Sequence, residues 1–203
     1  MRIKFLIFCL GLAIMTNCKK LETSGPSSIN GQVIDKTTGR GVPYAQVFVI
    51  GSSSGSLGGA LGNQQNGYTT ADGNGNYSIN FNWANGNYYN VTATAPLYYQ
   101  GLAVSTISIN EGKNNNVTIP IVPQGFVRFH IVPTYQCSDI GLYGMVSGFY
   151  DIYYPKDAYV VDMGYGNIKN VVMHKIYYAD SLKIYYDTIF VPEFDTINYT
   201  INY

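Results

Sequence analysis

The spacing that most resembles catalytic machinery is a serine flanked by glycines. Residues 51–55 read Gly-Ser-Ser-Ser-Gly, the G-x-S-x-G order of a hydrolase nucleophile with Ser53 at its centre. Such a serine needs a turn that opens into a helix, because backbone amides there stabilise the oxyanion. Residues 57–62 form helices poorly, and the two histidines, His130 and His174, lie far along the chain on expected strands. We therefore expect a flexible loop here and no catalytic residue.

A second candidate for chemistry is an oxygen-rich turn. Residues 72–76 read Asp-Gly-Asn-Gly-Asn, which offers side-chain oxygens at alternate positions, as a calcium loop does. An EF-hand would need glycine at its sixth position and glutamate at its twelfth, where this chain has Tyr77 and Trp83. The sequence also has no cluster of cysteine and histidine suited to zinc. We expect a hairpin turn here, with no metal and no cofactor.

The third candidate is a thiol near the start of the chain. Arg2 and Lys4 are followed by an apolar run over residues 5–15 and then by Cys18. The run is about half of the ~20 residues that a membrane-spanning helix needs, so it is typical of a signal peptide. The order resembles a bacterial lipoprotein signal, in which the cysteine is acylated and the preceding peptide removed, although Asn17 replaces the usual small residue. The alternative is an ordinary secretory signal that is cleaved nearby, or a poorly cleaved anchor.

The lipoprotein interpretation implies a location for the protein. Residues 1–17 would be the signal peptide, and lipid would tether the remaining body in the cell envelope, where we expect the outer membrane. Cys9 would be lost with the signal, which leaves Cys137 as a single thiol that cannot form an internal disulfide. We interpret Cys137 as a small buried hydrophobic residue.

Composition excludes one class of partner and indicates a sheet protein. The formal charge is zero and only 12% of residues are charged, so there is no basic stripe and we expect no nucleic acid partner. The 20 tyrosines and 22 glycines are typical of strands joined by tight turns. No stretch has a convincing helical period, so we expect an all-β fold.

The first half of the chain has the size of a β-sandwich, with about seven expected strands. The expected strands are residues 29–35, 44–50, 68–70, 76–83, 89–95, 103–109 and 117–121. In residues 76–83 apolar and polar side chains alternate, which predicts one face in the core and one in water. Because residues 72–75 tolerate positive φ, we expect residues 68–70 and 76–83 to pair as a hairpin.

Motifs in this half occur in a recognisable order. They are GQVID at residues 31–35, TG at 38–39, VPYAQV at 42–47 and TTADGNGNYSI at 69–79. This order resembles the carboxypeptidase regulatory-like, or prealbumin-like, domain of Gram-negative envelope lipoproteins and outer-membrane receptors. The resemblance covers residues 29–122, with an insertion at residues 51–67. It implies a seven-stranded prealbumin-like (Ig-like) β-sandwich with a binding or spacer role and no catalysis.

Residues 124–203 indicate a second, smaller β-sandwich-like domain, with a boundary near residues 123–125. Its expected strands are residues 127–131, 146–154, 171–178, 182–191 and 196–203. Arg128 and His130 are expected to face outward. The tetrapeptide KIYY occurs at residues 175–178 and 183–186, which predicts either two adjacent strands or one long strand interrupted at Asp180. Residues 18–28 are expected to be a flexible tether.

Two surface features bear on how such a protein would be used. Three Asp-hydroxyl-apolar triplets place Ser181, Thr188 and Thr196 in a pattern used for O-glycosylation in some Gram-negative envelopes, or at turns that enter strands. The tyrosines could present flat faces to sugar rings or to a partner protein, or could cover the sheets as ordinary strand residues. They include Tyr44, Tyr68, Tyr88, Tyr89, Tyr98, Tyr99 and a C-terminal set.

We therefore expect a lipid-anchored cell-envelope protein that is not an enzyme and acts as a binding or adhesion module. Its expected partners are the membrane, through the N-terminal lipid, and a glycan or an envelope protein. The alternative is a structural spacer that has no ligand of its own.

Overall fold

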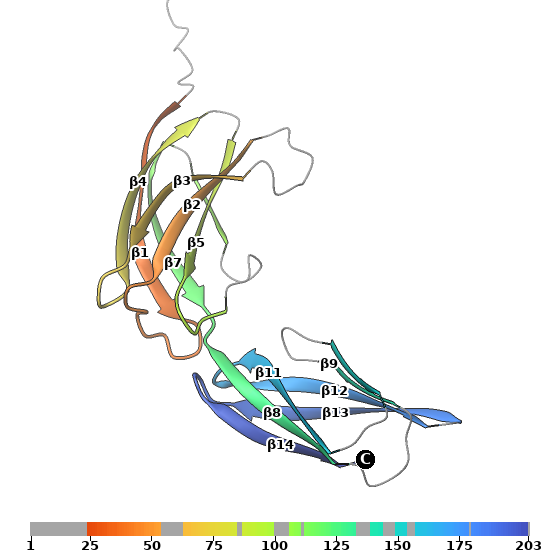
Figure 1. Ribbon diagram of the computed structural model, residues 1–203. Helices are drawn as coiled ribbons and strands as arrows, with labels where there is room; N and C mark the ends of the chain where they lie inside the picture. The colour runs from red at the N-terminus through yellow and green to blue at the C-terminus, as the bar shows by residue number, and fades with distance from the viewer. Residues whose placement is uncertain are drawn as a thin grey trace, which may run out of the picture.

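The computed structural model describes residues 24–53, 63–84, 87–99, 106–110, 112–132, 139–143, 149–153, 157–178 and 180–202. Every regular element in these ranges is a β-strand, which confirms the all-β class. Figure 1 shows the strands in two layered bodies that follow one another along the chain. In the same ranges, the chain has no helix with the length and hydrophobicity needed to cross a membrane.

The first body is a seven-stranded sandwich. Its strands are β1 (Ser24–Asp35), β2 (Gln46–Ser53), β3 (Asn63–Thr70), β4 (Asn76–Ala84), β5 (Asn87–Thr94), β6 (Ile107–Ile109) and β7 (Asn114–Ile121). One sheet has the order β4-β1-β7 and the other β3-β2-β5-β6. Strand β1 pairs parallel with β7, whereas the other pairs of this body are antiparallel.

Alternating side chains from both sheets form the core of the first sandwich. On β4, Tyr77, Ile79 and Phe81 are buried while the asparagine and serine residues between them are exposed, as the sequence predicted. Ile29 and Val33 of the central strand β1 meet residues of β2 and β5 in one hydrophobic cluster. Burial of one face of each sheet therefore holds the two layers together.

The hairpin predicted around residues 72–75 is wrong. Strand β3 pairs with β2 and β4 pairs with β1, so the turn crosses from one sheet to the other. Asp72 stabilises this corner, because its Oδ1 accepts the N–H groups of Asn74 and Asn76 at 2.8 Å. Hydrogen bonds from the side chain and amide of Asn76 and the amide of Asn74 lower the pKa of Asp72. The same turn residues suit a corner and a hairpin, and only the tertiary fold decides between them.

The first strand begins earlier than the sequence predicted. Strand β1 starts at Ser24, so residues 24–28 of the expected tether are paired with β4. Trp83 of β4 covers Gly25, where an added Cβ would lie 3.1 Å from the indole Nε1. Ser27 is buried and its hydroxyl donates to the Lys113 carbonyl at 2.8 Å. These tertiary contacts order a segment whose Gly, Pro and Ser composition is typical of a linker.

The second body is also a seven-stranded sandwich. Its strands are β8 (Gln124–Val132), β9 (Asp139–Tyr143), β10 (Phe149–Tyr153), β11 (Ala158–Tyr165), β12 (Ile168–Tyr178), β13 (Ser181–Val191) and β14 (Thr196–Asn202). The sheets have the orders β11-β8-β14 and β10-β9-β12-β13, and β14 lies parallel to β8. Sequence reasoning missed β9 and β11. The core includes Val127, Phe129 and Ile131 of β8 with Val172 and Ile176 of β12.

The repeated KIYY segments are two adjacent strands, which was one of the two alternatives. Strand β12 pairs antiparallel with β13, with Lys175 opposite Ile184 and Ile176 opposite Lys183. The repeat is therefore a local pair of strands in one sheet.

Contacts at the junction join the two sandwiches directly. Strand β7 ends at Ile121 and β8 begins at Gln124. Two pairs of aromatic rings cross the junction. The ring centres of Tyr98 and Phe194 are 5.3 Å apart, and those of Tyr99 and Tyr165 are 5.7 Å apart. A backbone hydrogen bond adds to them, because the N–H of Gln124 donates to the Leu97 carbonyl at 2.8 Å. The connection is short and packed on both sides.

Asp35 connects a turn of the first sandwich to this junction. Its carboxylate accepts hydrogen bonds from Thr37 and Thr38, and the Tyr98 hydroxyl donates to Oδ2 at 3.2 Å. Burial alone would raise the pKa of Asp35, but these hydrogen bonds outweigh burial and lower the pKa. Burial and the neighbouring charge of Asp35 raise the pKa of Tyr98. The aspartate of the first sequence motif therefore acts as an ionised hydrogen-bond acceptor beside the second sandwich.

Candidate functional site

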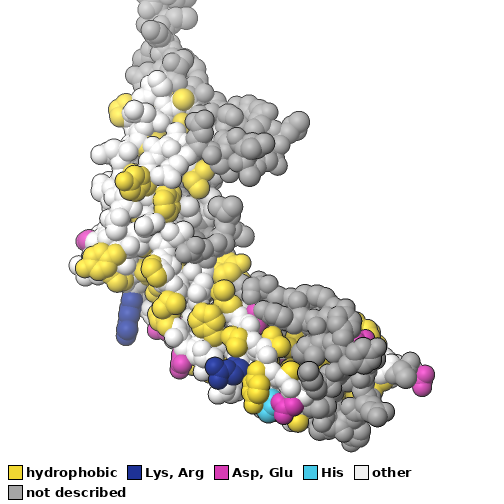
Figure 2. Space-filling model, viewed as in Figure 1, with side chains coloured by type: hydrophobic (Ala, Val, Ile, Leu, Met, Phe, Trp, Pro, Cys, Tyr) yellow, Lys and Arg dark blue, Asp and Glu magenta, His cyan; other side chains and the backbone are white. Residues whose placement is uncertain are grey.

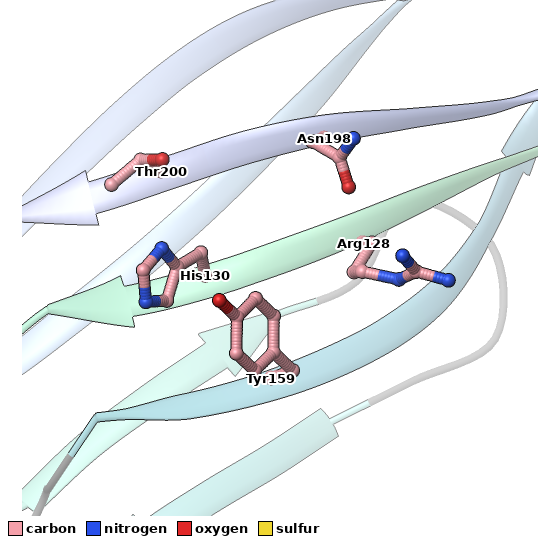
Figure 3. Close-up of a pocket in the computed structure, with 5 residues that line it drawn as sticks. All are labelled: Arg128, His130, Tyr159, Asn198 and Thr200. Carbon is pink, nitrogen blue, oxygen red and sulfur yellow. The ribbon is translucent and has the colours of Figure 1, made fainter.

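A hollow lined by both polar groups and apolar surface opens on the outer face of the sheet β11-β8-β14 (Figure 3). Its volume is about 520 Å³ and it is lined by Arg128, His130, Tyr159, Asn198 and Thr200. Arg128 and His130 lie on the central strand β8, Tyr159 lies on β11, and the other two lie on β14. Three neighbouring strands therefore position the site.

The register of the strands arranges these side chains in two rows. His130 lies opposite both Tyr159 and Thr200, and Arg128 lies opposite both Val161 and Asn198. The residues of β8 next to them, including Phe129, are buried on the other face of the sheet. The prediction that Arg128 and His130 face outward is confirmed, and it follows from the two-residue period of a strand.

Two neighbours hold the His130 ring. Its plane stacks on the Tyr159 ring at an angle of 8° with the ring centres 4.4 Å apart. Its Nε2 atom lies 2.8 Å from Oδ1 of Asp157, just before β11. The Tyr159 side chain remains 64% exposed, so much of it is available to a ligand. The imidazole thus supports the tyrosine while engaging the nearby carboxylate.

The other three residues that line the hollow have polar side chains without a hydrogen-bond or ion-pair partner among the described residues. Arg128, Asn198 and Thr200 are on the outer face, and none forms a side-chain hydrogen bond or ion pair with another residue in the part of the chain that the structure describes. Figure 2 shows basic, histidine and acidic side chains close together on the second body, next to apolar surface. The hollow therefore offers a cation, an amide, a hydroxyl and an aromatic ring to a ligand.

This combination of groups suits binding of a sugar. An aromatic ring packs against the C–H face of a sugar ring, and amide, hydroxyl and guanidinium groups can hydrogen-bond the sugar hydroxyls. The hollow has the volume of a site for a small ligand. Within the described ranges, no group of three His, Cys, Asp or Glu residues could hold a metal ion.

The second histidine lies elsewhere and is buried. His174 of β12 stacks on Tyr185 with ring centres 5.1 Å apart, and its Nδ1 lies 3.5 Å from Oδ2 of Asp187. Burial lowers the pKa of His174, and the charge of Asp187 opposes that effect only in part. It belongs to the interior of the second sandwich and does not line the hollow.

The structure does not bring the hydrolase-like residues together. Ser53 ends β2 in the first sandwich, whereas both histidines lie on strands of the second. Residues 54 and 55 of the motif lie outside the described residues, as do Cys18 and Cys137.

The three predicted acceptors of O-glycosylation lie on exposed positions. Ser181 and Thr188 belong to β13, and Thr196 begins β14. The amide of Thr196 donates to Oδ1 of Asp195 at 2.7 Å, which is the arrangement of a turn entering a strand. The modification of these residues stays a prediction.

The tyrosines named from the sequence have three different roles. Tyr44, Tyr68 and Tyr88 are exposed on the first sandwich, Tyr89 is buried, and Tyr98 and Tyr99 pack at the junction. Tyr159, which lines the hollow, was not singled out because its strand was not predicted. Asn198 and Thr200 lie in the expected strand at residues 196–203 but were not singled out as site residues. A prediction that β14 pairs with β8 would have been needed to place them beside Arg128 and His130.

Comparisons with known proteins find a family match for a little under half of the chain. Residues 28–122 match the family described as the carboxypeptidase regulatory-like domain. This confirms the resemblance found in the sequence. The comparison with curated proteins gives no significant match.

Several solved structures show partial likeness. GBS52, the minor pilin of Streptococcus agalactiae, is 12% identical with a TM-score of 0.43, and the alignment covers 87% of this chain and 94% of that one. A DUF3823 family protein from Parabacteroides merdae is 10% identical with a TM-score of 0.32, over 83% of this chain and 98% of that one. The Bacillus anthracis TIE protein is 9% identical with a TM-score of 0.38, over 87% of this chain. The chain spans about a third of that protein's length, because the alignment covers 34% of it.

Proposed function

Residues 28–122 form a carboxypeptidase regulatory-like domain, and from this premise we propose that the chain is a lipid-anchored cell-envelope protein that binds glycans. The second sandwich carries the binding site, and the first holds it away from the membrane. The protein acts as an adhesion or capture module and performs no reaction. The observation that carries the proposal is the hollow in which the exposed Tyr159 ring lies beside Arg128, Asn198 and Thr200. The side chains of these three residues form no hydrogen bond or ion pair within the described ranges.

The geometry favours a ligand that is both polar and flat. The stacked His130 ring restricts the Tyr159 side chain. Ligand binding therefore costs little side-chain entropy at Tyr159. The polar groups lie on three paired strands, whose backbone is fixed by the sheet. A rigid aromatic surface beside hydrogen-bonding groups provides both apolar contact and orientation.

A Tyr159→Ala variant is expected to bind its glycan at least about tenfold more weakly than the unchanged protein. Removing the ring removes an apolar contact worth roughly 1.5 kcal/mol, which is about a tenfold change in affinity. A glycan array with the full chain in detergent would identify sugars that bind. Isothermal titration calorimetry with those sugars would then measure the change in affinity.

The matched control is Tyr68→Ala, because Tyr68 is 70% exposed but lies on the first sandwich. This variant should keep the original affinity. Equal weakening by both substitutions, or none by Tyr159→Ala, would show that the hollow is not the site. If no glycan binds at all, the spacer alternative is favoured.

The lipid anchor is tested separately at the thiol. Cells that express the chain and are fed labelled palmitate should yield labelled protein, and Cys18→Ser should abolish the label and leave the signal peptide attached. The control is Cys137→Ser, which should retain the label. Mass spectrometry of the N-terminus would show whether the mature protein begins at Cys18. A soluble product that begins elsewhere would contradict the anchor.

A further inference from the structure

We infer that the hollow on the sheet β11-β8-β14 binds an acidic sugar and that Arg128 holds its anionic group. This inference rests on the proposed glycan function and specifies the chemical class of the ligand. It follows from the charges on this face and from their places in the strand register.

Arg128 is a cation without a partner in the part of the chain that the structure describes. It forms no ion pair or side-chain hydrogen bond within the described ranges, and its opposite residues on the two neighbouring strands, Val161 and Asn198, are uncharged. An exposed guanidinium is always charged at neutral pH, and its flat array of donors matches a carboxylate or a sulfate. An anionic ligand can therefore bind there without displacing an existing protein carboxylate.

Two carboxylates that lie just before strands of this sheet, those of Asp157 and Asp195, already accept hydrogen bonds or face a ring nitrogen. Oδ1 of Asp157 lies 2.8 Å from Nε2 of His130, and the strand register places Asp157 beyond His130 on the side away from Arg128. Asp195 precedes β14, and its Oδ1 accepts the amide of Thr196. The two ends of the hollow therefore differ. One end has the cation Arg128, and at the other end the carboxylate of Asp157 contacts the imidazole of His130.

The spacing of the two rows fits one sugar residue. Figure 3 shows Arg128 and Asn198 at one end of the hollow and His130 and Thr200 at the other, with the Tyr159 ring stacked beside His130. Residues two apart on a strand are separated by about 6.6 Å, which is comparable with the width of a sugar ring and its substituents. An acidic sugar can place its anionic group at Arg128, its ring beside Tyr159 and its hydroxyl groups near Thr200.

The test compares one sugar with and without its charge. We would titrate the full chain in detergent with oligogalacturonate and with the same oligosaccharide as its methyl ester, which keeps the ring and removes the negative charge. The acid is expected to bind at least about tenfold more tightly than the ester, and this preference should shrink as salt rises, because exposed charges are screened. A sulfated oligosaccharide forms a third arm, which distinguishes a sulfate ligand from a carboxylate ligand.

An Arg128→Gln variant should lose the preference for the charged sugars while keeping the weaker binding of the ester. The matched control is Lys169→Gln, which removes one exposed positive charge from β12 on the other sheet and should leave the preference unchanged. Unfolding curves would establish that both variants are folded.

The outcomes separate this inference from the proposed function. If the acid and the ester bind equally, or if only neutral glycans bind at a Tyr159-dependent site, the inference is overturned while glycan binding stands. The same holds if Arg128→Gln keeps the preference for the acid. If no glycan of any kind binds, the proposed function fails together with the inference.

Discussion

A Gly75→Ala variant is expected to lose about 3 kcal/mol of the stability of the first sandwich. Gly75 has φ of +81°, and an added Cβ would lie 2.5 Å from the Val33 carbonyl oxygen and 2.8 Å from the Val42 nitrogen. Those atoms cannot move apart freely, because the N–H of Val33 donates to the Gly75 carbonyl and the N–H of Val42 donates to the Val33 carbonyl. Urea unfolding followed by circular dichroism would measure the loss.

Gly39→Ala is the control that separates backbone strain from steric overlap. Gly39 also has positive φ, at +73°, but an added Cβ would meet no atom within 4 Å. This variant should lose only the strain energy of a left-handed residue, about 1 kcal/mol. Equal losses for the two variants would show that the contacts around Gly75 do not restrict its replacement.

A Phe129→Ala variant is expected to lose about 3–5 kcal/mol of the stability of the second sandwich and, with it, the glycan binding that we propose. Phe129 is 1% exposed and is the largest fully buried side chain among the described residues. It lies between Arg128 and His130 in sequence and packs against the Tyr199 ring, with ring centres 6.1 Å apart. Its removal would leave a cavity directly beneath the strand that carries two of the lining residues. Unfolding curves and the same glycan titration would measure both losses.

The control for this prediction is Phe190→Ala, because Phe190 belongs to the same sandwich but is 54% exposed. It should change stability by well under 1 kcal/mol, as surface substitutions usually do. If Phe129→Ala also changed the unfolding of the first sandwich by the same amount, the two bodies would be a single cooperative unit. A loss for Phe129→Ala no larger than that for Phe190→Ala would contradict the described core.

The sequence predicted the strands in which apolar and polar residues alternate within the strand itself. Strand β4 alternates so regularly that its buried face was correctly assigned, and the alternating residues of β8 placed Arg128 and His130 outward. The ordered motifs of the first half identified its family and hence a seven-stranded sandwich. The KIYY repeat left two alternatives open, and the antiparallel pairing of β12 with β13 confirms the one with two adjacent strands.

Features that depend on distant segments could not be predicted in this way. The corner at Asp72 has the same residues as a hairpin turn, and the choice depends on β1 and β2 as partners. Strand β11 has Tyr159, Val160 and Val161 in succession, so no alternation distinguishes its faces. The hollow requires β11, β8 and β14 to be neighbours, which is a property of the sheet topology. The sequence therefore did not predict that the five lining residues form one site, although it correctly predicted that Arg128 and His130 face outward.

The parallel pairing of β1 with β7 determines how the first sandwich would carry a mechanical load. The chain enters this body along β1 and leaves it along β7, which leads at once into the strand beneath the hollow. Tension between an anchored N-terminus and a captured ligand would pull these neighbours in opposite directions along their length. The paired residues run from Ser28 opposite Asn114 to Asp35 opposite Ile121. A pull along the strands would load the hydrogen bonds between them all at once, whereas a perpendicular pull would break those bonds one after another. The first sandwich is thus connected in the geometry that resists stretching most strongly.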